Sequence, residues 1–153
     1  MIKINEQFLT EFIKLAVKIH DDVVLMSGGL LGTKNLGLLE SAVSNLAYYD
    51  TFDEQLTNLI FSIAKNHAFN DGNKRASIAV SAYFLIIANY PTFIISKFIE
   101  DMEDIILMVV CGFITKEELG EFVVLIINDL PFYDELQLKW ILAKQKIDAL
   151  YGE

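Results

Sequence analysis

The chain has 153 residues, of which 54% are hydrophobic, and it carries a single cysteine and a net charge of −9 at pH 7. This length predicts one domain with a sizeable core, and the net negative charge disfavours direct binding to nucleic acid, which depends on neutralising phosphates with Lys and Arg. One cysteine excludes an intramolecular disulfide. Because the first residues lack the basic-then-apolar layout of a signal peptide, we expect a soluble, cytoplasmic protein.

The first half of the chain predicts helices interrupted by a glycine-rich loop. Apolar residues recur with a 3.6-residue period after Asn5, which is a possible N-cap, as is Thr10. Residues 27–37 hold four glycines in eleven positions and predict a loop. The helices expected here cover residues 5–22, 38–49 and 51–66.

The second half predicts more helices and at most one short extended piece. The elements expected in chain order are a strongly apolar helix from Lys74 to Tyr90, an extended piece within 90–96, and helices over 97–113, 115–130 and 132–152. Thr115 and Glu118 have the spacing of a capping box, and Gly152 suits a helix stop. We therefore predict an all-α fold. Residues 1–130 form its main domain, and 131–153 form a helical extension packed on that domain.

Two apolar segments in this half need an interpretation. Residues 76–96 contain no charge, but Pro91 should end the helix near Tyr90, so the remaining length is too short to span a membrane and we expect none. The last helix has an apolar face that we expect to pack on the bundle. Its members are Leu138, Trp140, Ile141, Ile147, Leu150 and Tyr151.

Residues 66–77, with the sequence NHAFNDGNKRAS, gather polar and charged side chains between two apolar helices. One helix is expected to end near Asn66 and the next to begin near Lys74, so HAFNDGN is a short loop that leads into a helix N-terminus. The first N–H groups of a helix lack intrahelical acceptors, and the helix dipole is positive there. Such a helix start is a site for anions.

The side chains of this loop suit a phosphorylated ligand. Gly72 permits a strained turn and a close approach of the backbone, while Lys74 and Arg75 add positive charge. Asp71 is a hard oxygen ligand of the kind that Mg²⁺ takes when it bridges phosphates. His67 is a candidate general base because its unperturbed pKa lies near neutrality. The pattern predicts chemistry on a phosphorylated ligand.

A purely structural interpretation of the loop is also open. In that case Asp71 or Asn73 caps the second helix, and Lys74 and Arg75 are merely solvated. However, cations at a helix N-terminus face the positive pole of the dipole, and a cost without a structural gain favours an anionic ligand. Phe69, which stands between polar neighbours, is expected to anchor the loop to the core.

The stretch HAFNDGNKR resembles the active-site motif of the Fic/Doc superfamily, H-x-F-x-[D/E]-G-N-x-R, and matches it at six fixed positions. It is most similar to the Doc (death-on-curing) branch, in which a lysine follows the asparagine, as Lys74 does here. The glycine-rich segment and helix at residues 27–43 are also similar to a segment of Doc-like proteins. The resemblance covers residues 1–130, and 131–153 have no counterpart in it.

The resemblance implies a Fic/Doc-like helical bundle with the active-site loop between two central helices. It also implies ATP as a substrate and Mg²⁺ as a cofactor. The site residues that it implies are a catalytic base, a metal ligand, two donors to phosphate and two phosphate clamps: His67, Asp71, Gly72 with Asn73, and Lys74 with Arg75.

The branch of the family decides which phosphate is expected to be transferred. Typical Fic enzymes transfer AMP from ATP to a target hydroxyl, and they have glycine after the asparagine and a second arginine three residues after the first. Here these positions are Lys74 and Ile78. In Doc-like members the lysine blocks that nucleotide pose and the γ-phosphate is transferred. The resemblance therefore implies a toxin that phosphorylates a hydroxyl of a translation factor similar to elongation factor Tu.

Two alternative functions are open. One is AMP transfer by the same His67 loop, since Gly72 matches the Fic pattern where some Doc proteins have alanine. The other is a catalytically idle module that binds a nucleotide or a partner. The nearest fit to the self-inhibitory motif of Fic enzymes, residues 96–101, ends in Asp101 where the motif has Gly or Asn. Restraint in trans by a small, Phd-like antitoxin bound beside the active site is therefore expected.

Overall fold

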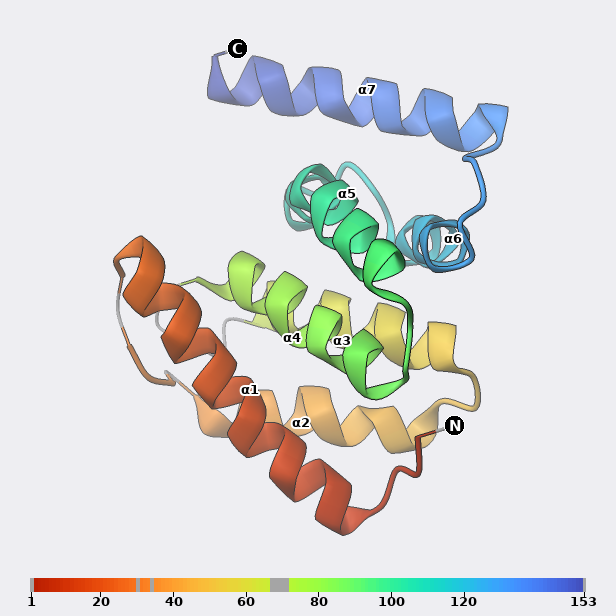
Figure 1. The fold of residues 1–153 in the computed structure, drawn as a ribbon. Coiled ribbons are helices and arrows are strands. Elements are labelled where there is room, and N and C mark those ends of the chain that lie inside the picture. Colours follow the sequence, from red (N-terminus) through yellow and green to blue (C-terminus); the bar gives the residue numbers. More distant parts are fainter. Residues whose placement is uncertain (1, 30, 34, 67–71, 153) are drawn as a thin grey trace.

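The computed structural model describes residues 2–29, 31–33, 35–66 and 72–152, and within these ranges it contains helices and no strands (Figure 1). The helices are α1 (Glu6–Ser27), α2 (Leu36–Ser44), the 3₁₀ helix η1 (Asn45–Tyr48), α3 (Phe52–Asn66), α4 (Asn73–Ile87), α5 (Thr92–Val110), α6 (Lys116–Ile127) and α7 (Asp134–Tyr151). The predicted all-α fold is confirmed.

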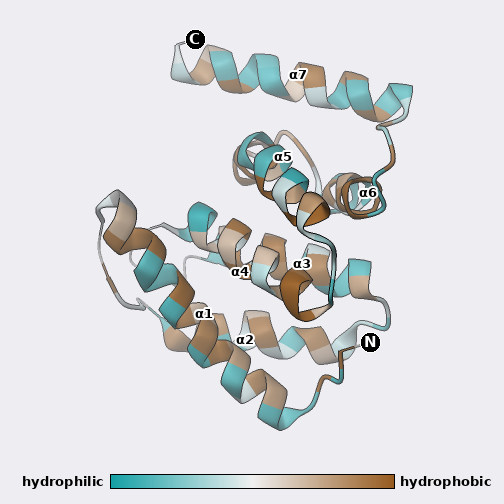
Figure 2. Cartoon of the chain, in the orientation of Figure 1, coloured by the Kyte–Doolittle hydropathy of each residue, from teal (hydrophilic) through white to brown (hydrophobic). Residues whose placement is uncertain are grey.

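The helices α3 and α4 form the centre of the bundle and pack against each other more extensively than any other described pair. On one side α1 lies across α4 and α2 lies against α3, while on the other side α5 and α6 cover the central pair (Figure 1). The hydrophilic residues of α4 gather at its N-terminal end, and the rest of the helix is largely hydrophobic (Figure 2). A helix that contacts neighbours on several sides needs this composition.

Buried side chains hold α4 in place along its length. The Ser77 hydroxyl, which is fully buried, donates a 2.7 Å hydrogen bond to the carbonyl of Ile60 on α3. Near the other end, the ring of Phe84 stacks on Phe52, with 4.9 Å between centroids, and meets Phe12 edge-on at 5.7 Å. Ser77 lies one turn from the start of α4, so its hydrogen bond fixes that end of the helix against α3.

Most predicted helix ends are confirmed where a local capping residue defines them. The Asn5 side chain accepts a 2.8 Å hydrogen bond from the Phe8 amide, as expected of an N-cap. Thr115 and Glu118 form the predicted capping box at the start of α6. Gly152 adopts a left-handed conformation with φ 75° after the last turn of α7. These signals are local, so they do not depend on the tertiary fold.

The extended piece predicted within residues 90–96 is wrong. α4 ends at Ile87, and α5 begins at Thr92 after Pro91, whose φ of −68° and ψ of 151° make it the N-cap. The β-branched side chains that favoured a strand lie inside the first turn of α5, where Ile94 is buried in the core. Tertiary burial therefore overrides the local strand preference. Among the described residues, no helix has the length and apolar character needed to cross a membrane.

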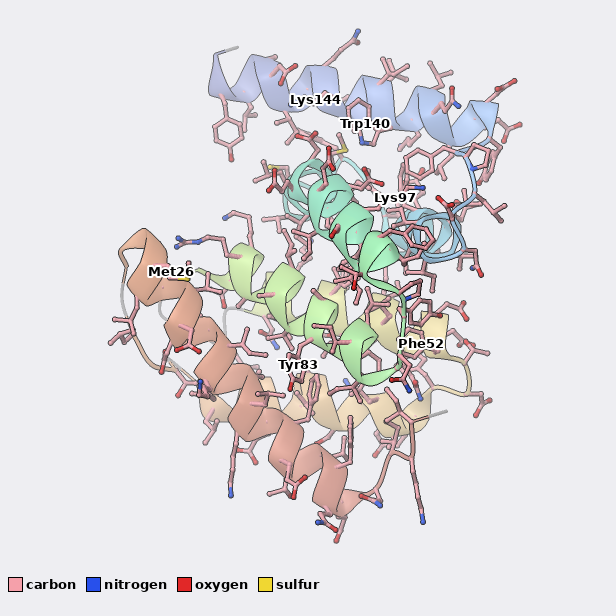
Figure 3. The ribbon with its side chains drawn as sticks, in the orientation of Figure 1. Met26, Phe52, Tyr83, Lys97, Trp140 and Lys144 are labelled. Atoms are coloured by element: carbon pink, nitrogen blue, oxygen red, sulfur yellow. The ribbon has the colours of Figure 1, made fainter. Side chains whose placement is uncertain are left out.

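The C-terminal helix α7 packs on α5, but partly through a different face from the predicted one. Its buried residues are Leu136, Ala143 and Ile147. Trp140 and Lys144 lie on the side that faces α5 (Figure 3), and Lys144 forms a 3.2 Å ion pair with Asp104 of that helix. Four members of the predicted face, which are Leu138, Ile141, Leu150 and Tyr151, are exposed instead. The helix has two apolar stripes, and helical periodicity does not indicate which of them meets a neighbour.

Candidate active site

The structure places four of the predicted site residues together at the start of α4. They are Gly72, Asn73, Lys74 and Arg75. The other three, His67, Phe69 and Asp71, lie outside the described residues, and their roles stay predictions. The loop that contains them joins the end of α3 to the start of α4, so the predicted position between the two central helices agrees with the element order.

Gly72 is the N-cap of α4 and has a left-handed backbone, with φ 70° and ψ 24°. Its carbonyl accepts a 2.8 Å hydrogen bond from the amide of Ala76, which closes the first turn. The N-cap position is therefore occupied by Gly72, and Asn73, which the purely structural interpretation offered for it, is the first residue of the helix. A left-handed residue at a helix start turns the chain sharply, and glycine adopts this conformation with the least strain.

The two cations occupy different environments. Lys74 is exposed on the first turn of α4, whereas Arg75 is partly buried. The Arg75 side chain folds back over the N-cap, because its Nη2 lies 3.4 Å from the position that a Cβ on Gly72 would take. Ile78, in contrast, packs against the hydrophobic core. The helix start thus presents Lys74 and Arg75 near its positive dipole end, which favours an anionic ligand.

The structure adds His20, which the sequence interpretation missed. Its side chain is fully buried, and its Nε2 lies 3.6 Å from the position that a Cβ on Gly72 would take. Four residues spaced by one helical turn form the buried stripe of α1: Phe12, Ala16, His20 and Val24. A histidine at an i+4 position of an apolar stripe is the signal that could have identified it.

Asp21 connects this histidine to the glycine-rich loop. Its Oδ1 lies 2.9 Å from His20 Nδ1 and accepts a 3.1 Å hydrogen bond from the amide of Gly32. The hydrogen bond from Gly32 lowers the pKa of Asp21, burial opposes this shift, and the hydrogen bond with His20 lowers the pKa further. At neutral pH the side chain is therefore a carboxylate, which only accepts hydrogen bonds, so Nδ1 of His20 carries the proton.

The end of α3 is held by a contact with α2. The Asn66 side chain donates a 3.0 Å hydrogen bond to the carbonyl of Leu38. Lys65, just before it, is exposed, and its Nζ lies 5.5 Å from the centroid of the Phe61 ring. The two helix ends that flank the motif are therefore both held in place, the end of α3 by α2 and the start of α4 by α3.

Comparison with known families finds one family whose model matches these helices. The model of the Fic/DOC family matches residues 8–85, which is more than half of the chain and runs from α1 to the last turn of α4. The chain belongs to the Fic/DOC family. No curated protein and no solved structure matches it significantly. The matched region contains α3 and α4, which flank the motif, together with α2 and the His20–Asp21 pair of α1.

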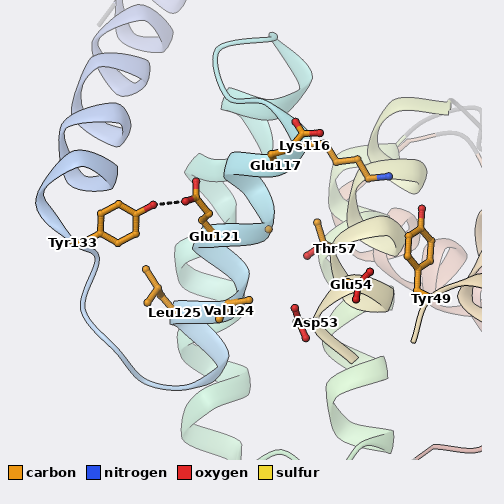
Figure 4. Close-up of a pocket in the computed structure, with 11 residues that line it drawn as sticks. Tyr49, Asp53, Glu54, Thr57, Lys116, Glu117, Glu121, Val124, Leu125 and Tyr133 are labelled. Atoms are coloured by element: carbon orange, nitrogen blue, oxygen red, sulfur yellow. Dashed lines mark hydrogen bonds between the residues drawn. The ribbon is translucent and has the colours of Figure 1, made fainter. Parts of the chain in front are cut away.

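A groove between α3 and α6 lies outside this Fic/DOC site. Its volume is about 540 Å³, and it begins at the N-terminal end of α3, whereas the motif follows the C-terminal end (Figure 4). Four carboxylates line it, with one lysine: Asp53, Glu54, Glu117, Glu121 and Lys116. Tyr133 donates a hydrogen bond to Glu121, and this bond raises the pKa of Tyr133 to about 12. An acidic lining repels phosphate, so the groove does not suit a nucleotide.

The acidic residues described here offer no site for a metal ion. Among residues 2–29, 31–33, 35–66 and 72–152, no group of three or more His, Cys, Asp or Glu side chains is arranged to hold one. The predicted Mg²⁺ ligand of this Fic/DOC protein, Asp71, lies outside these ranges. A magnesium site in the motif is therefore a proposal.

The Asp21 carboxylate should make the stability of the protein depend on pH in acid. Its pKa in the folded chain lies below the ordinary 3.8, so its contribution to folding is fully present above that value and is lost as the pH falls through the lower folded pKa. We expect Asp21→Asn to reduce the free energy of unfolding at pH 7 and to flatten the acid limb of the stability curve. Urea unfolding between pH 2 and pH 7 measures both effects.

The matched control for this measurement is Asp22→Asn. Asp22 is exposed and, within the described part of the chain, pairs only with Lys18 one turn away, at 3.1 Å. Exposed pairs of this kind stabilise by at most about 1 kcal/mol. An acid limb that changes equally in both variants would contradict the role of Asp21.

Proposed function

We propose that this Fic/DOC protein is a Doc-like toxin that transfers the γ-phosphate of ATP to a hydroxyl of a translation factor similar to elongation factor Tu, and so arrests translation. The observation that supports this reaction is the start of α4. Lys74 is exposed on the first turn, directly after Asn73, while Ile78 is packed against the core and provides no second cation. At positions 74 and 78, which distinguish Doc-like proteins from typical Fic enzymes, the residues are therefore those expected of the Doc branch.

The reaction needs little covalent chemistry from the protein. His67 would take the proton of the target hydroxyl, whose oxygen forms a bond to the γ-phosphorus while the bond to the β-phosphate oxygen breaks and ADP leaves. Gly72 and Asn73 would donate hydrogen bonds to the phosphates, and Lys74 and Arg75 would neutralise their charge. Phosphoryl transfer depends mainly on such positioning and charge stabilisation.

Magnesium would be the cofactor, with Asp71 as the residue that holds it, because a carboxylate is the oxygen ligand that Mg²⁺ prefers in phosphate sites. The bound ion would supply further neutralisation of phosphate charge. In the sequence Asp71 directly precedes Gly72, the N-cap of α4.

A small, Phd-like antitoxin is proposed as the partner that restrains the enzyme. The nearest fit to a self-inhibitory segment, residues 96–101, lies in the first half of α5. This part of α5 follows the C-terminal end of α4, whereas the motif precedes the N-terminal end. An inhibitor supplied by another chain is therefore the restraint that fits this arrangement.

AMP transfer is the second candidate function. It is favoured by Gly72, because the Fic pattern has glycine at this position, and the left-handed conformation of this residue is one that glycine adopts readily. The same His67 loop would then direct the target hydroxyl to the α-phosphorus, and pyrophosphate would leave.

Labelled ATP distinguishes the two reactions. We expect the purified protein, incubated with Mg²⁺ and a bacterial translation extract, to transfer label from γ-labelled ATP to a protein of the extract and to transfer none from α-labelled ATP. The measurement is the radioactivity of the protein bands after electrophoresis. Label from α-labelled ATP alone would replace the kinase by an AMP transferase. Label from neither, with ATP still bound, would support the idle binding module.

A further inference from the structure

We propose that His20 is a positioning residue of the phosphate site, which holds the start of α4 in its left-handed turn and couples it through Asp21 to the glycine-rich loop. The inference rests on the proposed function, since the site that it positions is the phosphate-binding start of α4. His20 belongs to α1, 52 positions before Gly72, and only the tertiary fold brings them together.

Burial of His20 points to a specific role. The side chain has 0% exposure on a stripe whose neighbours are Ala16 and Val24. A polar ring removed from water costs free energy unless its nitrogens are paired, and an apolar residue would fill the same space without that cost. The ring nitrogens of His20 therefore have a role other than filling space in the core.

The geometry assigns one nitrogen of His20 to each side. Nδ1 lies 2.9 Å from the Asp21 carboxylate, which orients the ring and fixes its tautomer. Nε2, on the far edge of the ring, then faces Gly72 at 3.6 Å from the position of a Cβ. Because glycine has no Cβ, the backbone of the α4 start can approach the ring closely. The imidazole of His20 therefore lies on the side of residue 72 where a side chain would otherwise be.

The same pair reaches the glycine-rich loop. Asp21 Oδ1 accepts from the Gly32 amide at 3.1 Å while it meets His20 Nδ1. Two side chains in succession on α1 thus connect the loop that precedes α2 with the start of α4. A displacement of the helix start by about 1 Å, which is the kind of shift that loss of this connection allows, can cost on the order of 100-fold in rate.

The test compares two replacements of His20 that separate packing from polarity. His20→Phe keeps a ring of similar size and removes both nitrogens, while His20→Gln keeps an amide group near the place of Nε2, the nitrogen that faces Gly72. If His20 only fills space, the Phe variant should be the more stable and the more active of the two. If His20 positions the site, the Gln variant should be the more active, although its flexible side chain lowers the melting temperature more.

The measurements are the melting temperature by circular dichroism, the affinity for ATP by calorimetry, and the rate of label transfer from ATP. For His20→Phe we expect a transfer rate reduced on the order of 10–100-fold, weaker ATP binding and an intact fold, and for His20→Gln a partial recovery of both functional values. Asp22→Asn, on the exposed face of the same helix turn, is the matched control and should leave all three unchanged. Should the Phe variant not fold, Asp21→Asn carries the same test, because the Asp21 side chain is 34% exposed.

The outcomes for His20 and for the proposed reaction are separable. The reaction is identified with the wild-type protein, from whether α- or γ-labelled ATP labels the target. The role of His20 is tested by the transfer rate of each variant relative to wild type, whichever label is transferred. A folded Phe variant with the ATP affinity and transfer rate of wild type overturns the positioning role, and so does a Gln variant less active than the Phe variant. A wild-type chain that binds no ATP overturns both proposals.

Discussion

Replacing His67 by alanine is expected to lower the rate of phosphate transfer on the order of 10²–10⁴-fold, which is the contribution typical of a general base. A hydroxyl attacks phosphorus poorly until its proton is removed, and His67 is the residue of the motif with an unperturbed pKa close to physiological pH. Label transfer from γ-labelled ATP to the target protein measures the effect. The affinity for ATP should change little, because the proposed phosphate contacts belong to residues 72–75.

Lys65→Ala provides a control from the same segment. Lys65 stands two residues before His67, is exposed, and has its Nζ 5.5 Å from the centroid of the Phe61 ring. We expect this variant to retain the wild-type transfer rate within a few-fold. Transfer by His67→Ala at the wild-type rate would exclude His67 as the base, and a large loss in the control would show that charge around the loop matters more than the proton acceptor.

Replacing Phe84 by alanine is expected to destabilise the fold by about 3–5 kcal/mol, the range measured for loss of a buried phenylalanine. The Phe84 ring has 0% exposure and contacts Phe52 and Phe12, so it ties α4 to the start of α3 and to α1. Since the free energy of unfolding of a domain is about 5–15 kcal/mol, the loss removes a large share of it. Urea denaturation followed by circular dichroism measures the change.

Phe93→Ala is the matched control for this deletion. Phe93 lies at the start of α5 and is 61% exposed, and surface substitutions away from special features usually change stability by less than about 0.5 kcal/mol. A loss in Phe84→Ala no larger than in this control would mean that the aromatic cluster does not carry the packing of α4.

These two replacements act on different properties of the same helix pair. His67 is proposed to act on the reacting proton, so its loss should leave the unfolding curve unchanged, whereas Phe84 is remote from the motif by more than two turns of α4 and should affect activity only through the folded fraction. Measuring both properties for both variants separates chemistry from scaffold.

Helices with local signals were predictable from the sequence. The Asn5 N-cap, the Thr115–Glu118 capping box and the Gly152 stop involve residues within one turn of each other, so nothing beyond the local chain decides them. The prediction of an extended piece near Pro91 was wrong because the preference of β-branched residues for strands is weak beside burial, and Ile94 is buried within α5. The prediction of the face through which α7 packs was partly wrong, because α7 has two apolar faces and both have the helical period.

The site itself was predictable in part. The HAFNDGNKR pattern was sufficient to predict the Fic/Doc family, and the family match over residues 8–85 confirms that prediction. The phosphate site between the two helices stays a prediction. The conformation of Gly72, the fold-back of Arg75 and the packing of Ile78 against the core are properties of the assembled bundle. No sequence period indicates them.

By itself the sequence determined that this protein is all-α, where most of its helices begin and end, and which nine-residue stretch resembles the Fic/Doc motif, because helix periods, caps and motif spacing are local properties of a chain. Only the tertiary structure decided that His20 lies against Gly72 and that Asp21 joins it to Gly32. These contacts link α1, the glycine-rich loop and the start of α4, and a contact between distant residues exists only after the helices have packed.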